Sequence, residues 1–477
     1  MREIIWDAAE AIEATGGKST IEWQASFVSI DSRNITPGDL FVALNGEKVD
    51  GHDFVRQAAE NGAAAAMVSR KPEGIPEDFP LLIVKDTVKA LEDLARYARQ
   101  RTRAKIIGVT GSVGKTSTKE MLKAALQVQG EVYASAGNLN NHYGVPLSLA
   151  RLPRDVDYGI FEMGMNHEGE ISALSKMVRP HVAIITTVEA VHLEYFDSVE
   201  KIADAKGEIF DGLEEGGTAV LNKDNPHYKR LVKCAKSRDI NRILSFGTST
   251  DALFRMVACT GEEEGARVTA RCSNKTLTYK IGLSGKHQAL NSVAVLAAVY
   301  AAGGDMEAAA RGFSDIIPQA GRGKEHVLKL PQGVCLLIDD TYNASPASIA
   351  AALAVLNERR KVMGGRAVAV LGDMLELGTA AKKLHTDLAK PVEAEATDLV
   401  FTVGPNMQYL QEALPKDKRG GHTALSSDAG AIIAERLKSG DVILVKGSRG
   451  TRMEQIVQYL LQHGSTAGVP SGVVHAV

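Results

Sequence analysis

Cysteine is scarce in this chain. Only four cysteines occur among its 477 residues, and no two of them form a C-x-x-C pair. This scattering argues against a disulfide framework and against a cysteine-based zinc site, and it is typical of proteins in a reducing cytosol. We therefore expect a cytoplasmic protein.

The sequence also lacks long apolar runs and an excess of charge of either sign. The longest apolar run, residues 293–302, is far shorter than the roughly 20 residues that a membrane helix needs. Residues 1–17 contain no apolar segment of the kind found in signal peptides. The formal net charge of −3 gives no attraction to nucleic acid or to an anionic membrane. We predict no membrane span, no secretion signal and no nucleic-acid partner.

The length and composition are those of a globular enzyme with several domains. A chain of 477 residues is too long for one hydrophobic core. Recurring strand and helix patterns predict an α/β fold with three domains and a tail. We expect a mixed α/β domain (residues 1–102), a central domain with a doubly wound, mainly parallel sheet (103–321), a C-terminal Rossmann-like α/β domain (322–463) and a flexible tail (464–477).

One stretch of the central domain predicts a phosphate site. Residues 106–109 form an apolar run typical of a buried strand, a glycine-punctuated turn follows, and a helical pattern begins near residue 115. Glycines let backbone N–H groups approach an anion, and the helix N-terminus adds positive charge. Lys115 can then reach the β- and γ-phosphates, and the Thr116 hydroxyl can bind Mg²⁺.

This stretch departs from the strict pattern G-x-x-x-x-G-K-[ST] at one position. Val109 stands where the first glycine is required, and Gly108 and Gly111 are present instead. An ordinary strand–turn–helix connection that contains Gly-Lys-Thr is the alternative interpretation. The order of strand, loop and helix favours the phosphate site.

Polar residues follow other strand-like runs of the central domain. Glu162 ends the run 158–161, and His192 follows the run 182–185 after a short linker. Because ligands of parallel sheets bind at the carboxyl ends of strands, these residues are candidates for one site, although each alone is as readily structural. Three asparagines, Asn138, Asn140 and Asn141, likewise follow the run 131–134.

Lys206 lies on the apolar face of an expected helix. It follows Ile202 by four residues and precedes Ile209 by three. Burying an ammonium group is costly unless the group is paired or loses its charge. The alternative is a side chain that extends along the helix surface to water.

The first and third domains carry further polar stretches. Residues 29–33 and 50–52 form polar clusters on loops, which fit a binding site or ordinary turn chemistry. An apolar run, residues 334–338, leads into Asp339 and Asp340. Residues 446–450, Lys-Gly-Ser-Arg-Gly, suit an anion or carboxylate, or an exposed basic turn. No G-x-G-x-x-G motif occurs in the third domain, so we predict no dinucleotide site there.

Together these motifs resemble the Mur ligase family, the ATP-dependent amide ligases of bacterial peptidoglycan synthesis. The resemblance covers nearly the whole chain except the tail, and it depends on the order and spacing of many motifs. These motifs are residues 31–33, 38–44, 50–52, 110–118, 137–141, 162–164 and 205–208, with His192, Asn291, Arg322 and Asp340.

The resemblance implies roles for individual residues. It implies two Mg²⁺ sites, one held by Thr116 and Glu162 and the other by His192 and a carbamoylated Lys206. It assigns Lys115, Lys206, His192 and Arg322 to catalysis. It assigns Gly111, Ser112, Gly114, Lys115, Thr116, Ser117, Asn291, Arg322 and Asp340 to ATP. It assigns Ser32, Arg33, Asp50, His52, Asn138, Asn141, Tyr342, Asn343, Lys446 and Ser448 to the substrates.

Two stretches of the third domain narrow the expected substrates. Residues 339–346 and 371–378 resemble the family member that uses UDP-N-acetylmuramoyl-tripeptide and D-alanyl-D-alanine, although Ser345 stands where Asn is common. The implied reaction forms an amide bond through an acyl phosphate, and the implied enzyme is a monomer. Two alternatives stay open. The first is another Mur-type or folylpolyglutamate-type ligase, and the second is a P-loop NTPase whose hydrolysis drives binding or transport.

Overall fold

The chain folds into two compact units, each built from several stretches of sequence. The computed structural model describes residues 3–46, 49–262, 264–330, 333–463 and 465–466. The first unit contains the residues up to Thr186 together with Asp204–Phe246 and Ala294–Gly312. The second contains Thr187–Ala203, Gly247–Val293 and the residues from Phe313 onward. The domain boundaries expected at residues 102 and 321 stay predictions.

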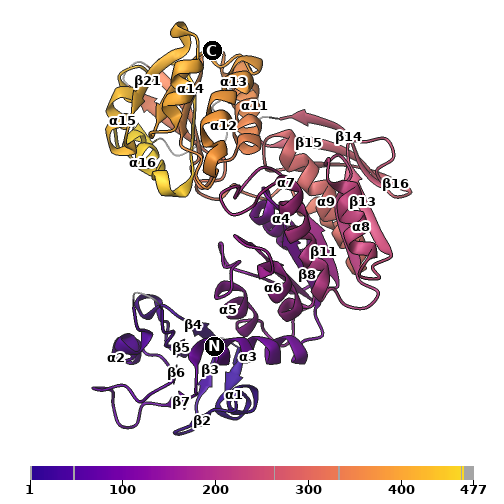
Figure 1. The fold of residues 1–477 in the computed structure, drawn as a ribbon, viewed down its shortest axis with the longest axis vertical. Coiled ribbons are helices and arrows are strands. Elements are labelled where there is room, and N and C mark those ends of the chain that lie inside the picture. Colours follow the sequence, from indigo (N-terminus) through magenta and orange to yellow (C-terminus); the bar gives the residue numbers. More distant parts are fainter. Residues whose placement is uncertain (1–2, 47–48, 263, 331–332, 464, 467–477) are drawn as a thin grey trace. The chain divides into compact units, whose positions relative to one another are not determined.

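The N-terminal part of the first unit is a five-stranded sheet with helices beside it (Figure 1). Its strands run in the order β2-β7-β6-β5-β4, and all neighbours are parallel except β2 and β7. Leu40 and Met67 pack into one core cluster, and Phe41 and Ala66 pack into another, as the two-residue period of a strand requires. The elements are β1 (Trp6–Asp7), α1 (Ala8–Thr15), β2 (Lys18–Ser19), β3 (Gln24–Ala25), β4 (Phe27–Ser29), β5 (Asp39–Val42), α2 (Val55–Glu60), β6 (Ala65–Val68), β7 (Leu81–Ile83) and α3 (Thr87–Arg101).

A parallel sheet forms the rest of the first unit. Its strand order is β13-β12-β11-β8-β10-β9, with every neighbouring pair parallel. Strand β8 lies between β10 and β11, so the chain order reverses beside it and the carboxyl ends of these three strands meet at a switch point. The predicted doubly wound parallel sheet is therefore confirmed. The elements are β8 (Lys105–Thr110), α4 (Lys115–Gln127), β9 (Val132–Ala134), α5 (Gly144–Ala150), β10 (Tyr158–Glu162), α6 (Glu170–Val178), β11 (Val182–Ile185), β12 (Thr218–Asn222), α8 (Tyr228–Lys236), β13 (Arg242–Gly247) and α10 (Met306–Arg311).

The second unit contains a three-stranded meander and a seven-stranded sheet. The meander is antiparallel, and the larger sheet has the order β21-β20-β19-β22-β18-β17-β23. Its first five strands are parallel, whereas β17 and β23 are antiparallel to their neighbours. The elements are β14 (Phe254–Gly261), β15 (Ala266–Cys272), β16 (Lys275–Ile281), β17 (Lys324–Leu330), β18 (Gly333–Asp340), α11 (Pro346–Met363), β19 (Ala367–Gly372), α12 (Ala381–Asp387), α13 (Ala389–Ala394), β20 (Leu399–Val403), α14 (Met407–Ala413), β21 (Arg419–Thr423), α15 (Ser426–Ala434), β22 (Val442–Lys446), α16 (Glu454–His463) and β23 (Ser465–Thr466).

Helices cover both faces of the seven-stranded sheet (Figure 1). One core cluster joins Leu444 of β22 to helices α11, α13 and α14, and the other joins its neighbour Val445 to α15 and α16. Alternate residues of one strand therefore face different helical layers, and the predicted α/β fold class is confirmed. Helices α7 (Val199–Gly207) and α9 (Lys286–Ala302) contribute residues to both compact units.

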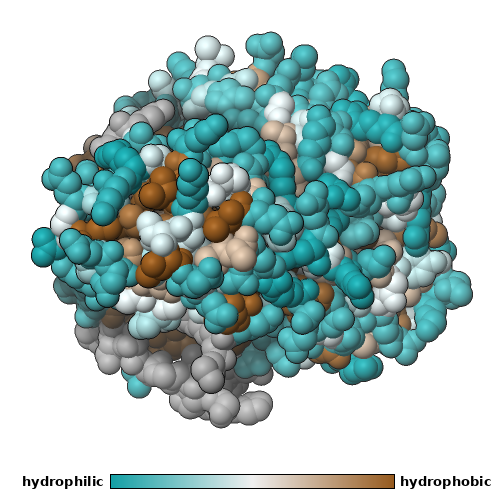
Figure 2. Space-filling view, turned by 90° about the horizontal axis from the view of Figure 1, so that it is seen from below, coloured by the Kyte–Doolittle hydropathy of each residue, from teal (hydrophilic) through white to brown (hydrophobic). Residues whose placement is uncertain are grey.

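The surface and the C-terminus add two observations. Hydrophilic residues dominate the face drawn in Figure 2, and its hydrophobic residues occur singly or in small groups. Across the described ranges, no helix is both long and apolar enough to cross a bilayer. Ser465 and Thr466 pair with β17, which differs from the flexible tail expected there, and the rest of that tail lies outside the described residues.

Candidate active site

The loop between β8 and α4 has the backbone of a phosphate site. Gly111 has φ 151°, and a Cβ at this position would lie only 1.9 Å from Thr186 Oγ1. Gly114 has φ 85° and precedes α4, so the left-handed region is used at the helix start. Both glycines let the chain turn sharply into the helix, and the first-turn N–H groups of α4 then face any anion placed above them. Ser112 lies in this loop and Ser117 in the first helical turn.

Lys115 and Thr116 begin α4 at the switch point of the sheet. The Lys115 ammonium donates a hydrogen bond to the Gly111 carbonyl (2.7 Å). Thr116 is buried, and its Oγ1 donates to Glu162 Oε2 (2.8 Å) at the carboxyl end of β10. A hydroxyl and a carboxylate thus meet beside the phosphate loop, and such hard oxygen ligands suit Mg²⁺. The predicted link between the phosphate loop and Glu162 is present.

Glu162 also holds the loop that leaves β9. Its Oε1 accepts a hydrogen bond from Asn140 Nδ2 (2.8 Å), and its backbone N–H donates to Ser135 Oγ (3.3 Å). Asn138 is exposed, whereas Asn141 Oδ1 accepts from the N–H of Gly144 (2.8 Å) at the start of α5. The three predicted asparagines therefore lie on one segment next to Glu162, with one of them bound to it.

Lys206 is buried near the end of α7. Only 2% of its surface is exposed. Burial lowers the pKa of its ammonium well below the ordinary value, and repulsion from Lys115 lowers it further. Within the described part of the chain, the Lys206 amine makes no hydrogen bond or ion pair. The alternative of a side chain reaching water is therefore wrong. A buried, unpaired amine of low pKa fits a lysine that reacts with CO₂.

The structure divides the predicted metal residues between the two compact units. Thr116, Glu162 and Lys206 belong to the first unit and His192 to the second. Among the described residues, no group of three or more His, Cys, Asp and Glu side chains could hold a metal ion. The two expected Mg²⁺ sites, one at Thr116 and Glu162 and the other at His192 and a carbamoylated Lys206, stay predictions.

His192 pairs with Glu376, which lies in the stretch 371–378 but to which the sequence analysis assigned no role. Its Nδ1 lies 2.5 Å from Glu376 Oε2, and the N–H of Glu194 donates to the Glu376 carbonyl (3.1 Å). This pairing lowers the pKa of Glu376. Both His192 (φ 57°) and Glu376 (φ 61°) adopt the left-handed conformation that non-glycine residues rarely use. The loop with His192 is therefore fastened to the loop that follows β19.

The carboxyl ends of β18 and β22 form a second polar cluster. The Lys446 ammonium donates to Asp340 Oδ2 (2.7 Å) and to the Asn343 carbonyl (2.9 Å). Burial raises the pKa of Asp340, and the attraction of Lys446 opposes this shift. Lys446 is therefore a buried ion-pair partner, and the exposed basic turn considered for its position is wrong. Ser448 Oγ accepts from the N–H of Leu375 (3.0 Å) in the same part of the sheet.

Arg322 stacks on an aromatic ring. Its guanidinium carbon lies 3.8 Å from the ring centre of Tyr342, and that of Arg449 lies 5.9 Å from the same ring. The turn before Arg322 is held by Asp339 Oδ2, which accepts from the Gly321 N–H (2.8 Å). Two cations thus flank one ring beside the second polar cluster. The predicted adenine residue Asn291 lies on α9 and is partly buried.

The two N-terminal clusters show the turn chemistry considered as an alternative. Asp31 and Asp50 each accept a hydrogen bond from the N–H two residues ahead and cap a short 3₁₀ helix. Arg33 pairs with Asp31, lowering its pKa to about 2. Ser32 Oγ donates to Gln57 Oε1 (2.7 Å). Their binding role stays a prediction.

His52 is buried between two loops. Its Nδ1 lies 2.6 Å from Asp50 Oδ1, and its Nε2 accepts from the Ser69 N–H (2.9 Å). The His52 N–H and the Arg70 guanidinium hold the pKa of Asp50 well below its usual range. His52 thereby fixes the loop that it belongs to.

The sequence analysis assigned no role to several polar residues near these clusters. Lys119 of α4 is wholly buried, and Asp373 after β19 accepts from the N–H groups of Asn406 (3.2 Å) and Met407 (2.8 Å). The Gly-Asp pair at the end of an apolar strand was the available signal for Asp373. No local sequence pattern indicates the hydrogen-bond partners of Lys119 and Glu376, because these partners are separated from them along the chain.

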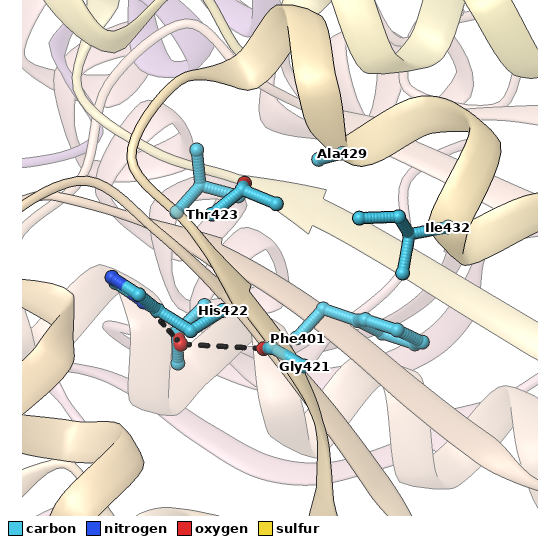
Figure 3. A pocket seen from close by; sticks show the side chains of 8 residues that line it. Phe401, Gly421, His422, Thr423, Ala429 and Ile432 are labelled. Atoms are coloured by element: carbon cyan, nitrogen blue, oxygen red, sulfur yellow. Dashed lines mark hydrogen bonds between the residues drawn. The ribbon is translucent and has the colours of Figure 1, made fainter.

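A small hollow lies elsewhere in the second unit, between β20, β21 and α15 (Figure 3). Thr402 Oγ1 points toward His422 Nδ1 (3.0 Å) and donates to the Gly421 carbonyl (3.4 Å). Among its labelled residues, Phe401, Ala429 and Ile432 are apolar, whereas Thr423 carries a hydroxyl. None of the predicted site residues lines it, and it does not form part of the candidate site.

Comparisons with known proteins agree with this geometry. Residues 24–99, 109–299 and 325–449 match the family profiles described as "Mur ligase family, catalytic domain", "Mur ligase middle domain" and "Mur ligase, glutamate ligase domain". The chain is 37% identical to UDP-N-acetylmuramoyl-tripeptide–D-alanyl-D-alanine ligase of Escherichia coli, over 92% of this chain and 94% of that protein. It is 35% identical to the enzyme of the same name from Rickettsia prowazekii, over 96% of this chain and 100% of that protein.

Solved structures give the same picture. A crystal structure of MurF from Acinetobacter baumannii superposes with a TM-score of 0.83 at 31% identity, covering 96% of this chain and 99% of that one. MurF from Thermotoga maritima in complex with ADP superposes with a TM-score of 0.76 at 29% identity, covering 92% and 97%.

Proposed function

This chain belongs to the Mur ligase family, and we propose that it is the ATP-dependent ligase that joins D-alanyl-D-alanine to UDP-N-acetylmuramoyl-tripeptide in peptidoglycan precursor synthesis. The observation that carries the proposal is the phosphate loop, whose Thr116 is hydrogen-bonded to Glu162 at the switch point of a parallel sheet. Relatives of that name align with nearly the whole chain, and they support the choice of substrates.

The reaction requires activation of a carboxylate. The terminal carboxylate of the tripeptide attacks the γ-phosphorus of ATP, a C–O–P linkage forms, and ADP leaves. The amine of D-alanyl-D-alanine then attacks the acyl carbon, and the tetrahedral species expels inorganic phosphate and a proton. Lys115, the N-terminus of α4 and Arg322 offset the charge of the transferring phosphoryl group, which is the main electrostatic demand of such a step.

Two sets of residues would hold Mg²⁺. Thr116 and Glu162 would hold one ion, and His192 with a carbamoylated Lys206 would hold a second. When bound, Mg²⁺ offsets the negative charge of the phosphates. The neutral Lys206 amine adds to the carbon of CO₂, an N–C bond forms, and one proton leaves to water, so that a neutral amine becomes an oxygen-bearing anion. Support comes from the burial of Lys206 and its lowered pKa.

The remaining predicted residues bind the rest of the ligands. Asn291 would contact the adenine and Asp340 the ribose of ATP. ATP is supported by the ADP complex of the Thermotoga relative. The UDP-sugar substrate would contact Ser32, Arg33, Asp50, His52, Asn138 and Asn141, and the dipeptide would contact Tyr342, Asn343, Lys446 and Ser448. We propose that the enzyme acts as a monomer in the cytoplasm.

A ligation assay tests the proposal. The purified protein is mixed with ATP, Mg²⁺ and a panel of UDP-muramoyl peptides and amines, and products are read by mass spectrometry together with phosphate release. We expect product and phosphate only when ATP, the tripeptide substrate and D-alanyl-D-alanine are all present, and neither from Lys115→Ala. Phosphate release from ATP alone would instead identify an NTPase that drives binding or transport.

A further inference from the structure

Helix α4, which follows the phosphate loop, contains a buried lysine, Lys119, one helical turn after Lys115. Lys119 is fully enclosed within the first unit. Its ammonium donates to the Ser135 carbonyl (2.6 Å) and to the Gly137 carbonyl (2.9 Å), and the Glu120 carboxylate lies 3.2 Å away. Burying a charge in this way is costly unless its hydrogen bonds are made. These contacts identify what Lys119 does in the fold, because both carbonyls belong to one segment.

That segment, residues 135–141, leaves the carboxyl end of β9 and is fixed a second time further along. Asn140 Nδ2 donates to Glu162 Oε1 (2.8 Å), and the Asn140 carbonyl accepts from the Gly164 N–H (2.8 Å). One end of the segment is therefore tied to α4 through Lys119, and the other to the end of β10 through Glu162. The same Glu162 carboxylate accepts the Thr116 hydroxyl.

Between these two ties the segment turns toward solvent. Gly137 has φ 51° and open space where a Cβ would be, and Asn138 is exposed. Within this stretch the backbone forms two short-range hydrogen bonds, from the Leu139 N–H to the Ala136 carbonyl (3.2 Å) and from the Asn140 N–H to the Asn138 carbonyl (2.8 Å), and the two ties connect it to the rest of the unit. An exposed carboxamide is in this way held beside the helix whose N-terminus forms the phosphate loop.

We propose that Lys119 is a positioning residue that fastens segment 135–141 to the phosphate-loop helix, so that binding of the UDP-linked substrate depends on the position of that helix. The proposal rests on the proposed function for the identity of the substrate. Ordering of α4 by ATP is passed to the segment through the two Lys119 hydrogen bonds. Without them, the buried Ser135 carbonyl and the partly buried Gly137 carbonyl lose a charged donor and the segment loosens.

The test compares Lys119→Met with Lys123→Met. Lys123 lies on the same helix, is partly exposed and makes no ion pair or hydrogen bond in the described chain, so it is a matched control. We expect Lys119→Met to raise the KM for UDP-N-acetylmuramoyl-tripeptide by about tenfold or more. The Kd for ATP and the KM for D-alanyl-D-alanine should stay within about twofold, and Lys119→Arg should recover part of the loss. Lys123→Met should resemble the wild type.

A merely structural role makes a different forecast. In that case Lys119→Met would lower the unfolding temperature, and the KM for the UDP-linked substrate, the Kd for ATP and the KM for D-alanyl-D-alanine would either all stay unchanged or all change by similar factors. Either result overturns the proposal. If Lys119→Met does not fold, Asn140→Ala replaces it, because it removes the second tie and leaves α4 intact. A KM for the UDP-linked substrate that is unchanged in Asn140→Ala would then overturn the proposal.

Hydrogen exchange separates this proposal from the proposed function. ATP with Mg²⁺ alone should increase protection of the amides of residues 137–141 in the wild type and in Lys123→Met, but not in Lys119→Met. If that difference appears although no UDP-muramoyl peptide is ligated, the proposed function fails while the positioning role stands. Equal protection in all three proteins would overturn the positioning role.

Discussion

Lys206 is held where a lysine cannot easily keep its charge. Its side chain is buried, its pKa is lowered by desolvation and by Lys115, and it lacks an acidic partner among the described residues. A lysine retained in such a place needs a chemical reason, because a methionine or leucine would fill the same volume at lower cost. The proposed conversion to a carbamate would supply that reason, since it would replace a destabilised cation by an anion able to bind a metal.

The first prediction concerns this modification. Lys206→Ala should lower ligation by about 100-fold or more, and Lys206→Arg should not restore it, because arginine keeps a cation where an anion is needed. A short-chain carboxylic acid added to the Ala variant should recover part of the activity. Wild-type protein incubated with ¹³C-bicarbonate should show a carbamate carbon in the NMR spectrum that is absent from Lys206→Ala. Full activity of Lys206→Arg would contradict the carbamate.

His287 allows a prediction about stability and pH. Burial, with repulsion from Lys446, lowers its pKa from 6.5 to about 4. Between pH 6.5 and about pH 4, His287 therefore binds a proton in the unfolded chain but stays neutral in the folded chain. The resulting stability is fully present above pH 6.5 and is lost as the pH falls from there toward about 4.

His287→Gln should consequently flatten the pH dependence of unfolding. Between about pH 7 and pH 4.5 the wild type should lose about 1 to 2 kcal/mol more than this variant, after allowance for partial exposure of the ring. The measurement is urea unfolding followed by circular dichroism, with His142→Gln at an exposed position as control. Parallel pH profiles for wild type and His287→Gln would rule out this histidine as the source.

Single residues differ in how far the sequence alone reveals them. The helical period placed Lys206 on a buried face, and the structure confirms that burial. Lys119 could not be found in this way. In the sequence it resembles an ordinary surface lysine of the helix that begins with Lys115. Its partners are backbone carbonyls 16 and 18 residues away, which carry no side-chain signature.

At the scale of elements, buried parallel strands were the most predictable part. Strands β8 and β11 contain the continuous apolar runs 106–109 and 182–185, as expected for strands of a parallel sheet that is covered on both faces. Contacts between loops were not predictable. The loop with His192 meets the loop with Glu376 although 184 residues separate the two side chains. Nothing in the sequence indicates that His192 and Glu376 adopt the left-handed conformation, because neither residue is a glycine.

The tie between these two loops leads to the next prediction. Glu376→Gln should weaken the hold on His192 and reduce ligation by about tenfold, because the orientation of a metal-binding histidine depends on the group that holds its other nitrogen. Hydrogen exchange should show faster exchange in residues 191–196 of the variant. Glu194→Gln, on the same loop and exposed, removes a carboxylate that does not contact His192 and should leave both unchanged. Exchange in Glu376→Gln equal to wild type would argue against the tie.

At the scale of the whole molecule, the compact units do not follow the linear order of the chain. The second unit includes Thr187–Ala203 and Gly247–Val293, which a sequence-based division assigns to the central domain. Hydrophobic patterns mark where elements begin and end, but long-range contacts decide which unit an element joins. The fold class was therefore predictable from the sequence, whereas the membership of segments such as the one with His192 was not.

The choice of the amine substrate is a property of the whole chain and gives the last prediction. D-alanyl-D-alanine should be ligated with a kcat/KM at least about 100-fold higher than that of D-alanine or meso-diaminopimelate. The physical reason is that a dipeptide can bring its own peptide bond and terminal carboxylate to polar groups such as Lys446 and Ser448, whereas a single amino acid leaves part of them unpaired. Competition between the three amines in one reaction, resolved by mass spectrometry, gives the ratio directly. Lys446→Met should lower the preference for the dipeptide, and Lys390→Met, at an exposed lysine of the same unit, serves as its control. Equal use of a single amino acid by the wild type would assign the chain to another branch of the family.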